Sequence, residues 1–251
     1  VRQGFQVALM VPTEILARQH VTSLSKLLAP LKVHVELLVA SQPAAERKII
    51  HAGLAAGEPM LVVGTQALLT DKAELPKLGL VIVDEQHRFG VSQRQVLKQK
   101  AGSLPHLLSM TATPIPRSLM LTIYGDLDIS ILKELPAGRK KIITKVVKAA
   151  DRTEMYTHVD AQIGEGRQVF IVCPLIDPND MTGAKSVVAE AERLKKTIFA
   201  HRRIAILHGK LKVDEKQRIM DMFVNKEVDI LVSTTVVEVG VDVPNASIML
   251  I

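Results

Sequence analysis

The sequence predicts an α/β protein with two domains, each built from a mostly parallel β-sheet flanked by helices. Short apolar runs recur along the 251 residues, and the first runs are followed by stretches with helical periodicity. The runs are continuous and do not alternate polar with apolar residues, which is typical of strands buried on both faces. Repeated strand–helix–strand units form right-handed crossovers, and these produce parallel sheets.

The first domain begins with an apolar run at Val7–Val11, and helical periodicity follows over Glu14–Leu28. A second run, Val33–Val39, leads into a helical stretch at Pro43–Ala56. A boundary is expected at the Pro- and Gly-containing segment 135–139, which gives domains of residues 1–135 and 136–251. The remaining expected strands are Met60–Val63, Leu78–Val83, Leu107–Met110, Val169–Val172, Ile204–Leu207, Ile230–Val232 and Ile248–Ile251.

Composition excludes several classes of protein. Hydrophobic residues make up 47% of the chain, which is enough for a substantial core. The single cysteine, Cys173, excludes a disulfide framework and a multi-cysteine zinc site, and its place after an apolar run indicates core packing. No apolar run approaches the roughly 18 residues of a membrane span, and no signal peptide is recognisable. We therefore expect a cytoplasmic protein.

The charge balance is basic, with 32 Lys and Arg against 26 Asp and Glu and a net charge of +6 at pH 7. This balance favours a polyanionic partner, and solvated surface charge is the alternative explanation. Aromatic residues make up only 3% of the chain, which disfavours a surface that stacks single-stranded bases. Any nucleic acid is therefore expected to be held through its phosphates.

The strongest functional pattern is an apolar strand that ends in two carboxylates, Asp84 and Glu85, followed by Gln86 and His87. In open α/β sheets, ligands bind beyond the carboxyl ends of the strands. Asp84 in that position can hold Mg²⁺ on the phosphates of a nucleotide, and Glu85 can orient or deprotonate the attacking water. The alternative is a solvated acidic turn.

Hydroxyl side chains follow other expected strands. Thr111 and Thr113 come after Leu107–Met110, where they suit either a contact with the carboxylates or an ordinary helix cap. Pro12-Thr13 and Gly64-Thr65 also stand at strand ends, where helix starts can contact a phosphodiester backbone. As isolated segments, these two pairs are better explained as helix caps.

The expected second domain carries a similar pattern after Ile230–Val232. Three hydroxyl residues, 233–235, open a segment that suits phosphate contacts. Gly240 permits backbone conformations that larger residues avoid, and Asp242 projects from the turn that follows. His208, after Ile204–Leu207, marks one more strand-end turn, for which an ordinary turn is the simpler explanation.

Six segments together resemble the motifs of superfamily 2 helicases in order and spacing: PTEILA, GTQALL, DEQHRFG, MTATPIPR, LHGK and STTVVEVGVDVPNA. The residues of these motifs resemble those of the RecG branch of bacterial DNA helicases, and the resemblance covers essentially the whole chain. A relative, the translocase of transcription–repair coupling, shares much of the pattern. Gln86, in place of a third acidic residue, favours the RecG branch.

The resemblance implies two RecA-like lobes, ATP in the cleft between them, and branched DNA such as stalled forks and Holliday junctions as the substrate. It implies that Asp84 holds Mg²⁺ and that Glu85 positions the water. The further residues that it implies are Gln86, His87, Thr111 and Thr113 for coupling, Gly240 and Asp242 for the nucleotide, and Pro12, Thr13, Gly64, Thr65, Thr234 and Thr235 for DNA.

The sequence departs from the helicase pattern at two points. It contains no phosphate-binding G-x-x-x-x-G-K-[ST] loop, since residues 183–186 fail that spacing, and no arginine-finger motif. We therefore expect a fragment with a truncated second lobe, separated from the wedge and C-terminal parts of its protein and inactive by itself, because an arginine finger alone contributes about 10³–10⁵ in rate. A non-catalytic DNA-binding module and an unrelated Mg²⁺-dependent hydrolase are the alternatives.

Overall fold

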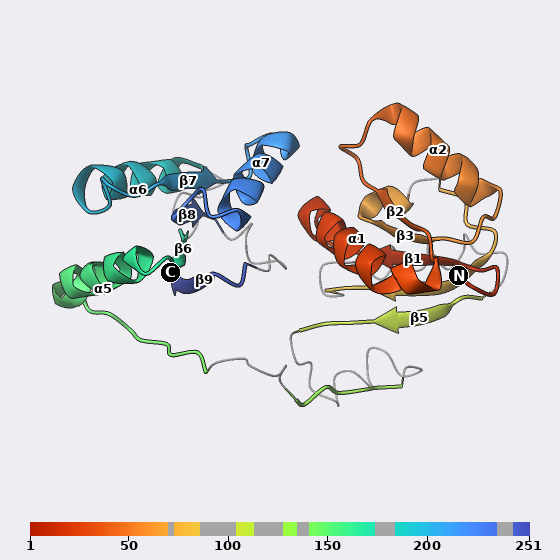
Figure 1. Cartoon of the computed structure of the whole chain (residues 1–251), viewed down its shortest axis with the longest axis horizontal. Coiled ribbons are helices and arrows are strands. Elements are labelled where there is room, and N and C mark those ends of the chain that lie inside the picture. Colours follow the sequence, from red (N-terminus) through yellow and green to blue (C-terminus); the bar gives the residue numbers. More distant parts are fainter. Residues whose placement is uncertain (70–72, 86–103, 113–127, 135–140, 174–183, 235–242) are drawn as a thin grey trace.

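The computed structural model contains two α/β units in chain order, each with one parallel sheet (Figure 1). It describes residues 1–69, 73–85, 104–112, 128–134, 141–173, 184–234 and 243–251. We name the unit with strands β1–β5 lobe 1 and the unit with strands β6–β9 lobe 2. Within the described ranges, no helix is both long and apolar enough to cross a membrane.

Lobe 1 is a five-stranded sheet in the order β2-β3-β1-β4-β5, and every neighbouring pair is parallel. Alternate residues of β1 point to opposite faces, so Ala8 and Met10 pack under α2 while Leu9 packs under α1. The two helices therefore cover opposite faces of the sheet. The bounds are β1 Gln6–Met10, α1 Glu14–Leu28, β2 Val35–Leu38, α2 Ala44–Ala55, β3 Leu61–Gly64, β4 Leu78–Val83 and β5 His106–Ser109.

Helix α1 has clear start and stop signals. Thr13 is its N-cap, with extended backbone, and the Thr13 side chain accepts a hydrogen bond from the Leu16 N–H at 3.3 Å. Glu14 in the first turn and Lys26 in the last turn match the helix dipole. A short 3₁₀ turn with Pro at its start follows, and Lys32 in the left-handed region ends the helical segment.

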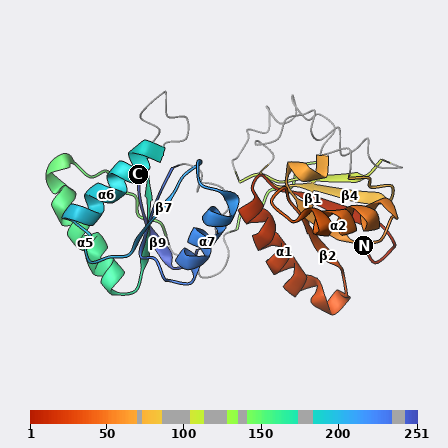
Figure 2. The same cartoon turned by 90° about the horizontal axis from the view of Figure 1, so that it is seen from above.

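Lobe 2 is a four-stranded parallel sheet in the order β7-β8-β6-β9. Val159 of α5 and Leu194 of α6 share one apolar cluster with Ile171, whereas Phe223 of α7 packs with Phe170 in another. Helices α5 and α6 thus cover one face and α7 the other (Figure 2). The bounds are α5 Arg152–Gly164, β6 Gln168–Val172, α6 Ala184–Thr197, β7 Ile204–Leu207, α7 Val213–Val224, β8 Ile230–Ser233 and β9 Ala246–Leu250.

The two sheets repeat one arrangement that no sequence repeat reveals. In both, the first strand lies between the third and the fourth, and a register shift follows its first residue, Gln6 in β1 and Gln168 in β6. Both glutamines are buried, and each donates a hydrogen bond to the carbonyl of the penultimate residue of a helix, Leu54 in α2 and Phe223 in α7. Each amide thus adds a hydrogen bond to a carbonyl at a helix C-terminus that also accepts a backbone N–H, from Gly57 at Leu54 and from Lys226 at Phe223.

The expected elements agree with the observed ones at most positions. The predicted bounds of α1, β4 and β7 match, and the other predicted strands differ by one or two residues at an end. Burial on both faces is correct for β3, β6 and β8 but wrong for β5 and β9, where residues along the strand are exposed or half-buried. The reason is that β5 and β9 are edge strands in the sheets that the described residues form. The expected boundary at residues 135–136 lies outside the described residues.

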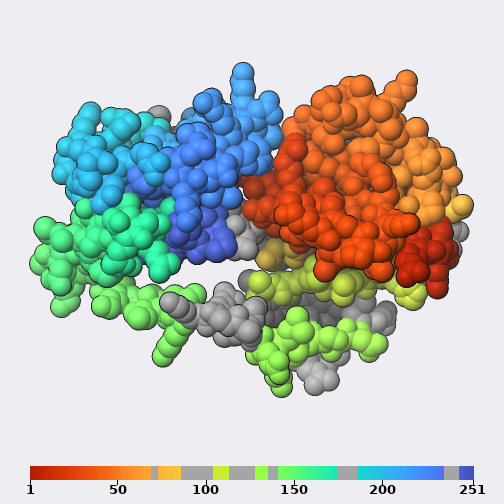
Figure 3. Space-filling model, in the orientation of Figure 1, coloured from red at the N-terminus to blue at the C-terminus, as the bar shows by residue number. Residues whose placement is uncertain are grey.

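The lobes meet where α1 faces α7, and the space-filling view shows them touching there (Figure 3). Ile15 at the start of α1 packs against the apolar cluster of lobe 2 that contains Leu207 and Met220. Arg18 of α1 lines a cavity of about 350 Å³ together with Asp214 and other residues from α7 onward. Helix α1 therefore belongs to the core of lobe 1 and also contacts lobe 2.

Candidate functional site

The carboxyl ends of the lobe 1 strands bring the predicted residues to one edge of the sheet. In the ladder, Met10 of β1 lies opposite Gly64 on one side and Val83 on the other. The pairing continues past the strands, because Val11 N–H donates to the Gly64 carbonyl at 2.9 Å and Asp84 N–H donates to the Met10 carbonyl at 2.9 Å. Pro12-Thr13 thus lies between Thr65 and Asp84, and Thr111 follows β5 beyond Asp84.

Asp84 is held by two hydrogen bonds. His20 of α1 lies with Nε2 at 3.2 Å from Asp84 Oδ2, and the Glu85 backbone N–H donates to Asp84 Oδ1 at 2.9 Å. The hydrogen bond with His20 lowers the pKa of Asp84 below its ordinary value, and partial burial opposes this without reversing it. Asp84 is therefore ionised at neutral pH.

Glu85 adopts a backbone conformation that is rare for a residue with a side chain. Its φ is +49°, in the left-handed region, and its Oε2 atom is buried. A residue in this region costs of order 1 kcal/mol or more and persists only where its surroundings hold it there, a situation that is concentrated at functional sites. The outlier thus falls on the residue that the sequence assigns to positioning water.

The Asp84 site fits a magnesium ion shared with a nucleotide. A hard cation prefers oxygen ligands, and protein Mg²⁺ sites usually combine one or two carboxylates with substrate phosphates and water. Each carboxylate oxygen of Asp84 accepts one of the hydrogen bonds above, which leaves lone pairs free for a cation. No group of three or more metal-ligating side chains occurs among the described residues. The described donor set suits a nucleotide-bound ion.

Two of the residues predicted to contact DNA in lobe 1 also have structural roles. The Thr13 hydroxyl is the N-cap of α1. Gly64 is buried at the end of β3, and a Cβ atom there would lie 2.3 Å from the Leu38 carbonyl oxygen, so the close approach of β2 requires glycine. Thr65 accepts the Leu68 N–H at 3.1 Å through its carbonyl, which leaves its side chain outside that turn.

The strand ends of lobe 2 bury polar atoms that have no partner among the described residues. These atoms are the hydroxyls of Ser233 and Thr234, both at most 2% exposed, and Nδ1 of His208. Leu207 lies opposite Ser233, and Thr234 N–H donates to the Leu207 carbonyl at 3.3 Å, so the three residues share one edge. Buried polar groups normally find partners, so this edge holds polar atoms whose partners are missing among the described residues.

Part of the predicted site lies outside the described residues, and the structure places one further residue, His20, beside Asp84. Gln86, His87, Thr113, Thr235, Gly240 and Asp242 lie outside the described residues. His20, which contacts Asp84, was not predicted to belong to the site. Its only sequence signal is its position on the helix that follows the Pro12-Thr13 segment, and that signal does not identify a partner 64 residues away.

Comparisons with known proteins agree with this geometry. The DEAD/DEAH box helicase family matches residues 1–122, and the helicase conserved C-terminal domain matches residues 150–251. Proteins named ATP-dependent DNA helicase RecG are 47% identical over 251 residues in Streptococcus pneumoniae and 48% identical over 252 residues in Aquifex aeolicus. Both alignments cover 100% of this chain but only 37% and 32% of those proteins. The chain thus spans about a third of their length.

Solved structures show the same fold. RecG bound to a three-way DNA junction is 42% identical, with a TM-score of 0.74 over 98% of this chain and 31% of that one. Dbp5 of S. cerevisiae bound to RNA and ADP BeF3 is 20% identical, with a TM-score of 0.71 over 98% of this chain and 61% of that one, and it supports the fold alone. With its two RecA-like lobes, the chain carries the DEAD/DEAH box and conserved C-terminal domains of helicases and is similar to RecG helicases over its whole length.

Proposed function

We propose that this chain is the motor core of an ATP-dependent DNA helicase that remodels branched DNA, such as stalled forks and Holliday junctions, in recombination and repair. The observation that carries the proposal is the ionised Asp84 followed by Glu85 in a strained conformation, at the carboxyl edge of a RecA-like lobe. The junction-bound RecG structure supports branched DNA as the partner. The domain division at residues 135–136 is part of the same proposal.

At the nucleotide side, ATP with Mg²⁺ supplies the phosphoryl group and a cation that neutralises its charge. Asp84 would hold the cation through its carboxylate. Glu85 orients the attacking water and can accept its proton. The proposal assigns Gly240 and Asp242 to the nucleotide face of lobe 2, and Gln86, His87, Thr111 and Thr113 to transmitting the state of the nucleotide to the rest of the motor.

At the DNA side, strand-end residues of both lobes contact phosphates, which positions DNA without reading its sequence. In lobe 1 these residues are Pro12, Thr13, Gly64 and Thr65, and their adjacency to Asp84 across β1 supports the assignment. In lobe 2 they are Thr234 and Thr235, and the place of Thr234 directly after β8 supports the assignment. The inactivity of the 251 residues alone belongs to the proposal, because their sequence holds no G-x-x-x-x-G-K-[ST] loop.

The substitution Glu85→Gln in the full-length helicase that carries this sequence tests the proposal. The variant keeps the size of the side chain and leaves Asp84 intact, so nucleotide affinity should stay within about twofold of the wild type. ATP turnover should fall by roughly 10²–10⁴-fold, the usual contribution of a positioned acid or base. Glu36→Gln, in an exposed ion pair of the same lobe, is the control and should leave turnover unchanged. Wild-type turnover in Glu85→Gln would remove Glu85 from the mechanism.

A further inference from the structure

Helix α1 reaches Asp84 from a distant part of the chain. His20 and Asp84 are 64 residues apart, and their side chains meet at 3.2 Å between Nε2 and Oδ2. Both side chains are mostly covered, with exposed fractions of 28% and 21%. His20 also lines an apolar groove of about 910 Å³ with other residues of α1, β4 and β5, and the 21% exposed fraction of Asp84 leaves its carboxylate accessible to ligands.

The direction of this hydrogen bond follows from the charge of Asp84. An ionised carboxylate only accepts hydrogen bonds, so His20 Nε2 must carry a proton and donate it. The second anchor, from the Glu85 N–H to Oδ1, comes from the adjacent residue and moves with Asp84. Of the two described anchors, only His20 ties the carboxylate to a separate secondary-structure element.

Stability alone does not explain the pair. A partly exposed ion pair contributes about 0–1 kcal/mol. Lobe 1 contains a second pair of the same chemistry, His34 with Glu36 at 2.6 Å, where the His34 side chain is 64% exposed. Glu36 lies in β2 and His34 directly precedes that strand, and neither residue has a described contact with Asp84. The His34–Glu36 pair therefore serves as a control that has the same chemistry as His20–Asp84 but lies away from Asp84.

We propose that His20 is a positioning residue for Asp84: its Nε2–H holds the carboxylate in the orientation in which Asp84 meets Mg²⁺. This inference rests on the proposed function, in which Asp84 is the Mg²⁺ ligand. Groups that orient metal ligands through hydrogen bonds typically change metal affinity by about 10–100-fold when they are removed. His20 is expected to act in that range without touching the nucleotide.

The experiment uses the full-length helicase that carries this sequence and a fluorescent ADP as the probe. ADP affinity is measured in EDTA and across a Mg²⁺ titration, alongside ATPase activity across the same titration. In His20→Ala, the Mg²⁺ concentration needed for half-maximal ADP binding should rise about 10–100-fold, with affinity in EDTA unchanged. His20→Gln keeps an N–H donor at similar reach and should restore most of the Mg²⁺ response. His34→Ala should behave as the wild type.

The outcomes distinguish this inference from the function on which it rests. A wild-type Mg²⁺ titration in His20→Ala would overturn the positioning role, and so would an equal loss of ADP affinity in EDTA. If His20→Ala does not fold, His20→Gln and His20→Asn carry the test, and a wild-type response in Asn, which has a shorter reach, would also count against the inference. Asp84→Asn tests the proposed function separately, because a wild-type Mg²⁺ response there removes Asp84 as the ligand.

Discussion

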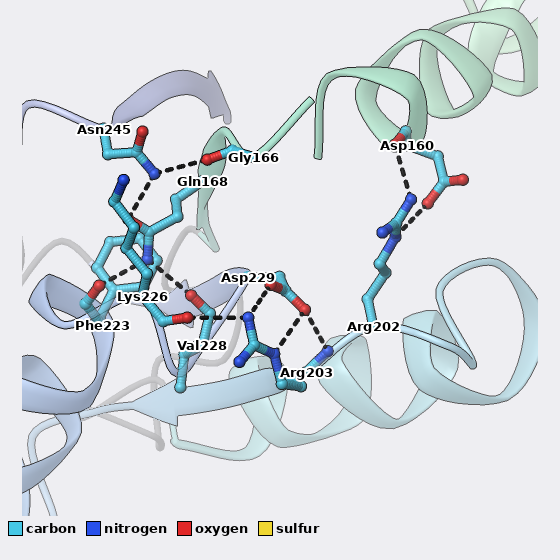
Figure 4. Close-up of polar contacts among 10 residues, drawn as sticks. All are labelled: Asp160, Gly166, Gln168, Arg202, Arg203, Phe223, Lys226, Val228, Asp229 and Asn245. Carbon is cyan, nitrogen blue, oxygen red and sulfur yellow. Dashed lines mark hydrogen bonds and ion pairs between the residues drawn. The ribbon is translucent and has the colours of Figure 1, made fainter. Parts of the chain in front are cut away.

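Gln168 offers a sharp test of how lobe 2 is held together. Its side chain is 2% exposed and makes three hydrogen bonds (Figure 4). Nε2 donates to the carbonyls of Phe223 at 2.6 Å and Val228 at 2.7 Å, and Oε1 accepts from Asn245 Nδ2 at 3.0 Å. The substitution Gln168→Leu keeps a similar volume and removes all three bonds. Leucine has no donor group that could replace the amide at the two carbonyls.

The expected cost follows from those two carbonyls. A buried polar group left without a partner costs about 1–3 kcal/mol. Only the Val228 carbonyl loses its one described partner, because the Phe223 carbonyl keeps the Lys226 N–H at 3.1 Å. The burial of leucine in place of an amide offsets part of the cost, so we expect a loss of about 1–3 kcal/mol. Against a usual stability of roughly 5–15 kcal/mol, this is a large fraction.

The single cysteine makes the loss measurable in lobe 2 alone. Cys173 is buried at the end of β6, and burial raises the pKa of its thiol, so it reacts with thiol reagents mainly when lobe 2 opens. When reclosing is faster than labelling, the labelling rate reports the opening equilibrium. A loss of about 1–3 kcal/mol should accelerate the labelling of Cys173 by about 5- to 140-fold, at tenfold per 1.4 kcal/mol.

Gln6 provides the matched control in lobe 1. It is buried, donates to the Leu54 carbonyl at 2.7 Å and accepts from the Lys77 N–H at 3.1 Å. Gln6→Leu should destabilise lobe 1, as seen by urea denaturation, with little change in the labelling of Cys173. Labelling at the wild-type rate in Gln168→Leu would refute the reasoning about the two carbonyls. Equal acceleration in both variants would show that the lobes open together.

Two further predictions concern packing and acid stability. Gly64→Ala should destabilise lobe 1 by about 1–3 kcal/mol in urea denaturation, because the new Cβ would lie 2.3 Å from the Leu38 carbonyl oxygen. Gly164→Ala, whose new Cβ would lie at an ordinary contact distance of 3.7 Å from the Arg202 guanidinium, is the neutral control. Asp160 and Asp229 should make lobe 2 acid-sensitive (Figure 4). The hydrogen bond from Arg202 lowers the pKa of Asp160. For Asp229, burial raises the pKa, but the hydrogen bonds from Arg203 lower it by more than burial raises it. Both pKa values therefore lie below the ordinary 3.8. Their stabilisation is therefore present above that value and lost as the pH falls through the lowered pKa values. Denaturation between about pH 5 and 2 should show this loss, and Asp229→Asn should flatten it; an unchanged pH profile in that variant would contradict the assignment.

The strands and the first helix could be predicted because local sequence decides them. Glu14–Leu28 has a cap, a matching charge at each end and helical periodicity, and Leu78–Val83 is a continuous apolar run between polar segments. The position of a strand in its sheet is not local information. Residues of β5 alternate between exposed and half-buried because β5 lies at the edge, and the apolar run at 107–110 carries no mark of that place.

The candidate site divides along the same line. Asp84 and Thr65 could be predicted because the carboxyl ends of parallel strands share one edge, so chain order alone brings them together. The contacts of His20, Gln6 and Gln168 could not be predicted, because a polar residue on a helix or at the start of a strand has many available partners.

The two glutamines also show why the structural repeat of the two lobes escapes sequence comparison. In each lobe the buried amide at this one position makes specific hydrogen bonds, including one to a helix-end carbonyl, while core positions need only apolar residues of suitable volume. Two sheets can therefore keep the same strand order and the same buried amide while the identities of the surrounding residues diverge.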